Sequence, residues 1–442
     1  MAEHPLDLSS RFIDSGVADG PHNRISEELS ELGDDLALVE SFSHVLLVRT
    51  DEGLVAFDSS GRRSGRDVVA AIRGWSDEPI HTLVYTHGHL DHVGGSSAFA
   101  ADADDRGRPR PRVLGHENVN LRLDRYDLTD GYNRVINLRQ FGGAPMVGGE
   151  GMGGGRSFVP DGTLRTDTEY RDRLTETIGG VELRLHHAMG ETDDHTWTWL
   201  PDHSLISAGD QFIWNFPNCG NPQKVQRYPV EWAQSLRAMV ATGAELFVPA
   251  HGLPIVGTER IRQCLETVAS TLEKLVDDVL AAMNTGARLD AIVHEVGVDP
   301  AVLELPYLRP LYDEPEFVVR NLWRLYGGWY DGTPSRLKPA SDASLGLEIA
   351  SLAGGALRLA DRAQALAGEG DLRLACHLAD YAAEAEPESK AVHTTRAEIY
   401  QQRRSAERSL MAKGIFDSAR AQSEFVVTGE NQSRSVKPSM GE

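Results

Sequence analysis

The stretch that decides the fold is Thr86-His87-Gly88-His89-Leu90-Asp91-His92, whose first residue ends the short apolar run IHTLVYT at residues 80–86. Its imidazole nitrogens and carboxylate oxygen are the ligand types that Zn²⁺ and related metals take. In a tight turn, His87 and His89 can face one metal ion while Asp91 and His92 face a second. A buried strand before the string and a glycine pair after it favour a metal-binding turn over a histidine-rich surface turn.

Composition narrows the possible partners. The chain has 442 residues and a net charge of −22, which argues against a nucleic-acid backbone or an anionic membrane surface as the main partner. No apolar run approaches the roughly 18–20 residues of a membrane helix, and the N-terminus lacks a signal-peptide pattern, so we expect a cytoplasmic protein. Cys219, Cys264 and Cys376 are interpreted as free thiols of a reducing compartment.

Strand and helix patterns alternate around the string. Residues 36–60 suggest a hairpin whose second strand ends at Asp58, and residues 67–75 have helical spacing. Further strands are expected at 181–190, within 195–210 and at 245–252. This alternation favours an α/β layered fold.

The character of the sequence changes near residue 258. Residues 258–286 form one long amphipathic pattern, and residues 343–420 are rich in Ala, Leu, Glu and Arg, which predicts several helices. We therefore place a domain boundary there, with a helical domain over 258–427 and a polar, disordered tail over 428–442. The Gly-rich stretch 141–155 is interpreted as a lid or a substrate-facing loop.

The THGHLDH string resembles the metallo-β-lactamase superfamily, and the order of the surrounding segments is similar over residues 36–255. The resemblance implies an αββα sandwich for residues 1–257, with two Zn²⁺ or other divalent transition metals at one edge. It implies that Asp58 supports the metal-binding turn, and that a metal-bridging hydroxide performs hydrolysis with Asp91 and Asp210 as catalytic carboxylates. The implied ligands are His87, His89 and Glu191 for one metal, Asp91, His92 and His251 for the other, and Asp210 as the bridge.

Two segments beyond residue 258 resemble the alkyl sulfatases. EFVVRNLWRLYGGWYDGTPSRLKP (316–339) resembles their dimerisation signature, and residues 352–387 resemble the helical repeat that follows it. This implies a homodimer and a small anionic substrate with an apolar part, a sulfate ester of an alkyl alcohol. The apolar aromatics of 323–330 belong either to the dimer interface or to an intramolecular core: Trp323, Tyr326, Trp329 and Tyr330.

Substrate contacts are implied for Asn218 and His195, although Asn218 is equally a plain turn residue and His195 equally a supporting partner. The chain also departs from the alkyl sulfatase pattern. GETDDHTW at 190–197 stands where GTEAPAEM is usual, GDQ replaces AEN around Asp210, and Gln223 occupies the place of a sulfate-holding arginine. An arginine fork suits a tetrahedral oxyanion. Hydrolysis of a lactone, carboxylic ester or β-lactam is therefore the alternative, and a non-catalytic partner-binding protein is a third hypothesis.

Overall fold

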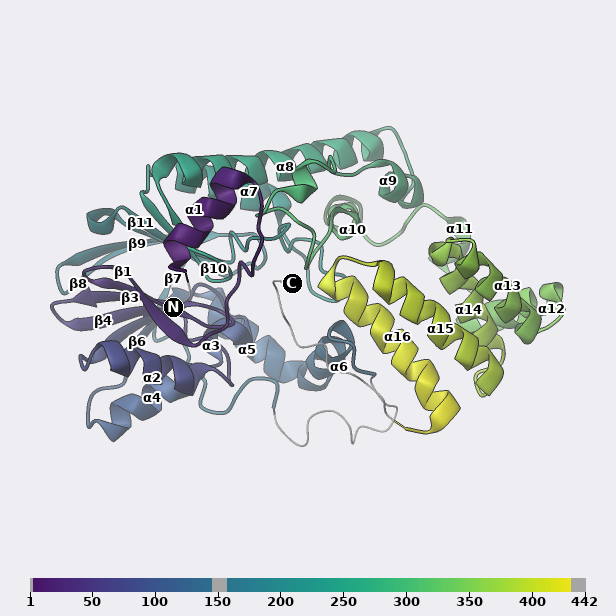
Figure 1. Ribbon diagram of the computed structural model, residues 1–442, viewed down its shortest axis with the longest axis horizontal. Coiled ribbons are helices and arrows are strands. Elements are labelled where there is room, and N and C mark those ends of the chain that lie inside the picture. Colours follow the sequence, from purple (N-terminus) through teal and green to yellow (C-terminus); the bar gives the residue numbers. More distant parts are fainter. Residues whose placement is uncertain (1–2, 145–156, 431–442) are drawn as a thin grey trace. The chain divides into compact units, whose positions relative to one another are not determined.

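The computed structural model describes residues 3–144 and 157–430. Most of the Gly-rich stretch 141–155 and the tail beyond residue 430 lie outside the described residues. The expected fold class is confirmed: an α/β part built on two sheets precedes a helical C-terminal region (Figure 1). The described chain divides into two compact units. One holds the residues up to Asp130 and Ser157–Gly328. The other holds residues 131–144 and the described residues from Trp329 onward.

The first sheet has strand order β1-β2-β3-β4-β5-β6-β7, antiparallel from β1 to β4 and parallel from β4 to β7. Its strands are β1 (Glu28–Gly33), β2 (Leu36–Glu40), β3 (Val45–Thr50), β4 (Gly53–Phe57), β5 (Ile80–Val84), β6 (Arg112–His116) and β7 (Thr168–Tyr170). The hairpin expected over residues 36–60 thus consists of three paired strands, β2, β3 and β4, because the chain also turns between Glu40 and Val45.

The second sheet has strand order β13-β12-β11-β10-β9-β8 and is antiparallel except where β11 pairs with β12. Its strands are β8 (Arg173–Ile178), β9 (Val181–Ala188), β10 (His195–Leu200), β11 (Leu205–Gly209), β12 (Leu246–Pro249) and β13 (Ile255–Val256). Strands β9, β11 and β12 run in one direction, so their carboxyl ends lie at the same edge of the sheet. This edge receives the candidate site.

Alternating side chains bury both faces of each sheet. Leu38 and Val48 of the first sheet share a core with Leu185 and Leu205 of the second. On the outer face of the first sheet, α2 (Gly65–Trp75) and α4 (Ser96–Asp105) pack against a separate core that includes Leu47. On the outer face of the second, α7 (Pro229–Val240) and α8 (Thr258–Asn284) form the fourth layer. The result is the expected αββα sandwich.

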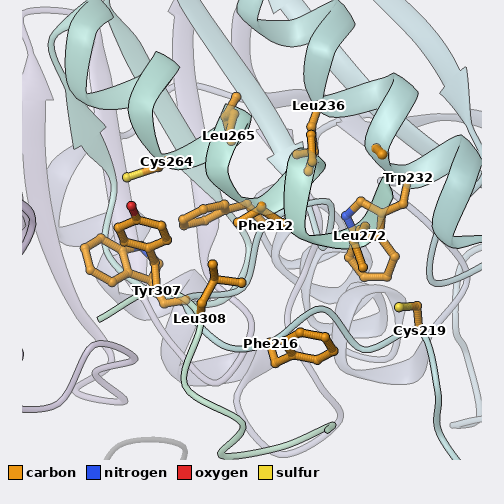
Figure 2. Packing of buried hydrophobic residues seen from close by; sticks show 14 of the residues in the cluster. Phe212, Phe216, Cys219, Trp232, Leu236, Cys264, Leu265, Leu272, Tyr307 and Leu308 are labelled. Carbon is orange, nitrogen blue, oxygen red and sulfur yellow. The ribbon is translucent and has the colours of Figure 1, made fainter. Parts of the chain in front are cut away.

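The predicted helix at 258–286 is α8, but it belongs to the sandwich unit. Leu265 and Leu272 of α8 are fully buried against Phe212 and Trp232 (Figure 2). This stripe completes the outer core of the second sheet, and the compact unit that contains it continues to Gly328. The same unit holds α1 (Pro5–Ser15), α3 (Leu90–Val93), α5 (Asn118–Leu128), α9 (Leu289–Glu295) and α10 (Pro315–Gly327).

The helical unit packs consecutive helices in pairs. It comprises α11 (Pro334–Leu337), α12 (Asp342–Ala353), α13 (Ala356–Gly368), α14 (Leu372–Ala385), α15 (Lys390–Ala406) and α16 (Leu410–Thr428). Buried alanines such as Ala360 and Ala382 let these helices approach closely. An unexpected member is α6 (Asp130–Gln140), whose last carbonyl lies against Gly414 of α16.

No single helix in the described part of the chain has the length and apolar content to span a membrane. The consecutive helices α12 and α13 reach that threshold only when taken together, and they are bent by 84°. The three cysteines are free, as predicted, and Cys219 and Cys264 are buried.

Candidate metal centre

The THGHLDH string lies where β5 ends, as the sequence predicts. His87 and His92 are fully buried, and α3 begins within the string at Leu90. Asp58, directly after β4, braces this turn. Its Oδ1 accepts a hydrogen bond from the Thr86 backbone N at 2.7 Å, and its Oδ2 lies 2.8 Å from both Thr86 Oγ1 and His92 Nδ1. A carboxylate on the far nitrogen of an imidazole fixes the ring and leaves Nε2 free to bind a metal.

The remaining predicted ligands come from the edge of the second sheet. Glu191 follows β9, Asp210 follows β11 and His251 follows β12. All are buried, with Glu191 and Asp210 each 4% exposed. The packing of the two sheets brings these residues to the histidine turn.

Seven residues predicted as ligands gather into three overlapping groups, each with ligand atoms within 4.8 Å of one another. The groups are His87–His92–Asp210, Asp91–His92–His251 and His89–Glu191–Asp210. The second group matches the set expected for one metal. Asp210 belongs to both other groups. The other predicted set, His87, His89 and Glu191, is divided between these two groups, and His87 is grouped with His92.

Distances within the cluster leave room for cations between the ligand atoms. Asp210 Oδ2 lies 3.4 Å from His92 Nε2 and 3.8 Å from His87 Nε2. Asp91 Oδ2 lies 3.3 Å from His251 Nε2. Among the described residues, His92 Nε2, Asp210 Oδ1 and Glu191 Oε2 are buried without a hydrogen-bond partner. Buried polar atoms ordinarily have partners, so this donor set fits divalent metal ions.

Burial and the neighbouring charges shift the pKa values of the cluster in opposite directions. Burial alone would raise the pKa of Asp210, but His92 and His251 outweigh it and hold that pKa well below its usual value. Burial also disfavours the charged form of His92, yet Asp210, Asp91 and Asp58 together raise its pKa. Burial dominates at His87 and His89 and lowers the pKa of both imidazoles. Neutral imidazoles and ionised carboxylates are the forms that bind metal.

Asn218 reaches the cluster, and Arg227, which was not among the predicted site residues, joins it. Asn218 Nδ2 donates to Glu191 Oε1 at 2.5 Å. Arg227 Nη1 lies 2.5 Å from the same oxygen and donates to the Asn218 backbone O at 2.6 Å. Burial raises the pKa of Glu191, with Arg227 opposing that rise and Asp210 adding to it. In the sequence, Arg227 is the second of two cations after Asn218, with Lys224 before it, and this spacing does not reveal its partner.

Lys224 lies near the cluster but was not among the predicted site residues. Lys224 interacts electrostatically with Asp91, Glu191 and Arg227, and burial together with Arg227 lowers its pKa to about 8. Gln223, in the place of the expected arginine, is half-buried.

His195 lies at the first position of β10 and is fully buried. Its Nε2 accepts a hydrogen bond from the Asp210 backbone N at 2.9 Å. The imidazole therefore faces a ligand-bearing segment of the protein, which is the geometry of the supporting alternative rather than of a substrate contact.

Residues 38–251 match the family model of the metallo-beta-lactamase superfamily, and residues 288–424 match the model for alkyl sulfatase dimerisation. A linear primary-alkylsulfatase from a Pseudomonas species is 27% identical over 374 residues, which are 80% of this chain and 69% of that protein. An (R)-specific secondary-alkylsulfatase from Pseudomonas is 24% identical over 81% of this chain, which spans 57% of that relative. The solved structure of an inverting sec-alkylsulfatase from Pseudomonas has the same fold, with a TM-score of 0.78 at 20% identity over 92% of this chain and 67% of that one.

Proposed function

Because the chain belongs to the metallo-β-lactamase superfamily and carries an alkyl sulfatase-type dimerisation region, we propose that it is a dinuclear metal-dependent hydrolase that cleaves sulfate esters of alkyl alcohols. The observation that carries the proposal is the convergence of the ligand groups on Asp210, which belongs to two of the three. A carboxylate that lies near ligand atoms of both predicted metal sets suits a pair of cations better than a single one.

The predicted ligands fall into two sets with one shared residue. His87, His89 and Glu191 would hold one cation, Asp91, His92 and His251 the other, and Asp210 both. Two bound Zn²⁺ ions supply hydroxide at neutral pH by lowering the pKa of water, and they polarise an anionic substrate oxygen. Overall, water adds to the ester, one bond of the sulfate ester bridge breaks, and the alcohol and sulfate leave.

The anion would be held by residues beside the cluster. Asn218 brings a side-chain amide and Lys224 an ammonium group to the Glu191 side of the site. Arg227 is committed to Glu191 and to the Asn218 backbone, so it keeps this loop in place. In this proposal Lys224 supplies the positive charge that the arginine at the place of Gln223 would otherwise bring.

The first test is to incubate the zinc-loaded protein with a medium-chain alkyl sulfate and to quantify inorganic sulfate. We expect release from the unaltered protein and loss of release in Asp210→Ala. A protein confirmed to hold two zinc ions per chain that releases no sulfate would refute the substrate assignment. If Asp210→Ala loses all activity, a role as a non-catalytic scaffold is excluded as well.

The second candidate is hydrolysis of a lactone, carboxylic ester or β-lactam at the same centre. Gln223 favours it, because a neutral amide there lowers the positive charge offered to a sulfate group. Lactone and ester panels tested on the same zinc-loaded preparation distinguish the two. Turnover of such a substrate without sulfate release would establish this candidate over the first.

We also propose that the protein is a homodimer assembled through its helical region. Trp329 is 70% exposed, and α12 leaves Leu347 and Leu352 exposed by 57% and 81%. Exposed large apolar side chains of this kind are candidates for burial in an interface. Light scattering should give twice the chain mass at micromolar concentration, and Leu352→Glu should lower that mass. A monomer that resists changes in concentration would refute the homodimer.

A further inference from the structure

Two successive residues at the start of β10, Asp194 and His195, each accept a hydrogen bond from the backbone of a ligand-bearing segment. Asp194 Oδ2 accepts from the Gly88 N at 2.9 Å, and His195 Nε2 accepts from the Asp210 N at 2.9 Å. We propose that Asp194 and His195 form a clamp of positioning residues that sets the histidine turn and the bridging carboxylate at metal-binding distance from each other. The inference rests on the proposed metal centre.

The Asp194 half of the clamp is rigid. Arg122 Nε donates to the same Oδ2 at 2.9 Å, and the side chains of Asp194 and Arg122 are 0% and 2% exposed. A Cβ on Gly88 would lie 2.9 Å from Asp194 Oδ2 and 3.0 Å from Arg122 Cδ, so only glycine fits there. Since Gly88 stands between His87 and His89, a displacement of its amide moves both imidazoles.

The His195 half of the clamp acts on Asp210. Because Nε2 accepts a hydrogen bond, the neutral ring carries its proton on Nδ1. The ring stacks on His87 with centroids 4.9 Å apart. The backbone of Gly209 lies in the left-handed region with φ +55° and passes close to the His195 ring. A Cβ added to Gly209 would lie 2.7 Å from His195 Cε1. His195 is fully buried and packs between His87 and Gly209.

A third bond joins the same strand to the turn, since the Thr196 N donates to the Thr86 O at 2.6 Å. Three consecutive residues, 194–196, therefore hold the first sheet's turn and the second sheet's Asp210 segment at once. Outer partners of metal ligands typically change metal affinity by about 10–100-fold when removed. The clamp is expected to act through geometry, without any contact to substrate.

The test measures Zn²⁺ affinity by competition with a chromophoric chelator, with folding monitored by circular dichroism and no substrate present. We expect Asp194→Ala to weaken zinc binding by about tenfold or more, and Asp194→Asn, whose amide oxygen still accepts, to restore most of it. Asp193→Ala is the matched control. Asp193 also pairs with Arg122, but it is 42% exposed, and within the described residues its side chain makes no hydrogen bond or ion pair with the turn, so its loss should leave affinity within twofold.

His195→Leu and His195→Gln form the second pair, with the glutamine variant retaining an acceptor near the Asp210 amide. A folded Asp194→Ala or His195→Leu variant with unaltered zinc affinity would overturn the clamp, and so would an equal loss in Asp193→Ala. If Asp194→Ala does not fold, the zinc affinities of His195→Leu and His195→Gln test the clamp instead. Failure of the unaltered protein to bind zinc would remove the proposed function and the clamp together, whereas unaltered affinity in the variants removes only the clamp.

Discussion

Arg227 and Glu191 form a buried ion pair, with Arg227 Nη1 2.5 Å from Glu191 Oε1 and both side chains 3–4% exposed. Asn218 donates to the same oxygen. One oxygen of the carboxylate is thereby occupied, while Oε2 has no partner among the described residues. Glu191 can therefore offer Oε2 to a cation while its other oxygen stays fixed to the loop at 218–227.

Arg227→Leu should disable the site. Removing one partner of a buried ion pair costs about 3–5 kcal/mol, because the remaining charge is left uncompensated. Arg227 lowers the pKa of Glu191, so the loss of Arg227 should raise that pKa further. We expect catalytic efficiency to fall by about 100-fold or more, equivalent to roughly 3 kcal/mol.

The control for Arg227 is Arg184→Leu. Arg184 pairs with Glu182 and is 48% exposed, and exposed pairs contribute little. Steady-state kinetics and bound zinc are measured on both variants. A site that tolerates Arg227→Leu as well as Arg184→Leu would contradict the role of the buried pair.

Zinc should stabilise the protein strongly. Adding Zn²⁺ to chelator-treated protein provides partners for His92 Nε2, Asp210 Oδ1 and Glu191 Oε2, which are buried without any. A ligand at 1,000 times its Kd stabilises the folded state by about 4 kcal/mol. The melting temperature should rise by several degrees, and Asp210→Ala should lose most of that rise. Equal shifts in both proteins would place zinc elsewhere.

Asn321 of α10 should affect substrate binding although it lies outside the cluster. Its Nδ2 donates to the Cys219 O at 2.8 Å and to the Arg227 O at 2.9 Å, so it holds both ends of the loop that carries Asn218. Asn321→Ala leaves two buried carbonyls without this donor, at a cost of about 1–3 kcal/mol. We expect a higher KM and a lower melting temperature, whereas Arg320→Ala, which removes an exposed pair with Glu316, should change neither.

Asp313 should make stability depend on pH. Burial raises its pKa to about 7, although the backbone N–H groups of Gly220 and Glu314 oppose the rise. The folded state then binds more protons than the unfolded state between about pH 4 and pH 7, so stability falls as pH rises through that window, by up to about 1.4 kcal/mol per pH unit. Asp313→Asn should flatten the dependence. Urea midpoints at pH 5 and pH 8 measure it, and parallel profiles for the two proteins would contradict the assignment.

The helical unit should be sensitive at Gly414. A Cβ there would lie 1.7 Å from the Gln140 O, so Gly414→Val must force α6 and α16 apart. Gly368 of α13 has nothing within 4 Å of its Cβ position, and Gly368→Ala should stabilise its helix by up to about 1 kcal/mol. Thermal unfolding should shift in opposite directions for the two variants. A tolerated Gly414→Val would show that α6 does not pack on α16 as described.

The turn and the long helix were predictable because their signals are contiguous. His87 to His92 lie within six residues, and the stripe of α8 repeats at helical spacing. The helical spacing does not indicate which part of the molecule the apolar stripe packs against. It packs on Phe212 and Trp232 and so belongs to the sandwich. The position of α6 in the helical unit is likewise set by a contact with Gly414, a residue far along the chain.

The sequence by itself determined the ligand types, their order along the chain and the α/β alternation, because these depend on residue identity and local spacing. Only the tertiary structure decided that Arg227 pairs with Glu191, that His195 faces the Asp210 backbone, and that Asp194 holds the Gly88 amide. Each of these contacts joins segments that the chain separates and the packing of two sheets brings together. A backbone amide has no residue-specific signature, so a hydrogen bond to it becomes visible only when the fold places its acceptor.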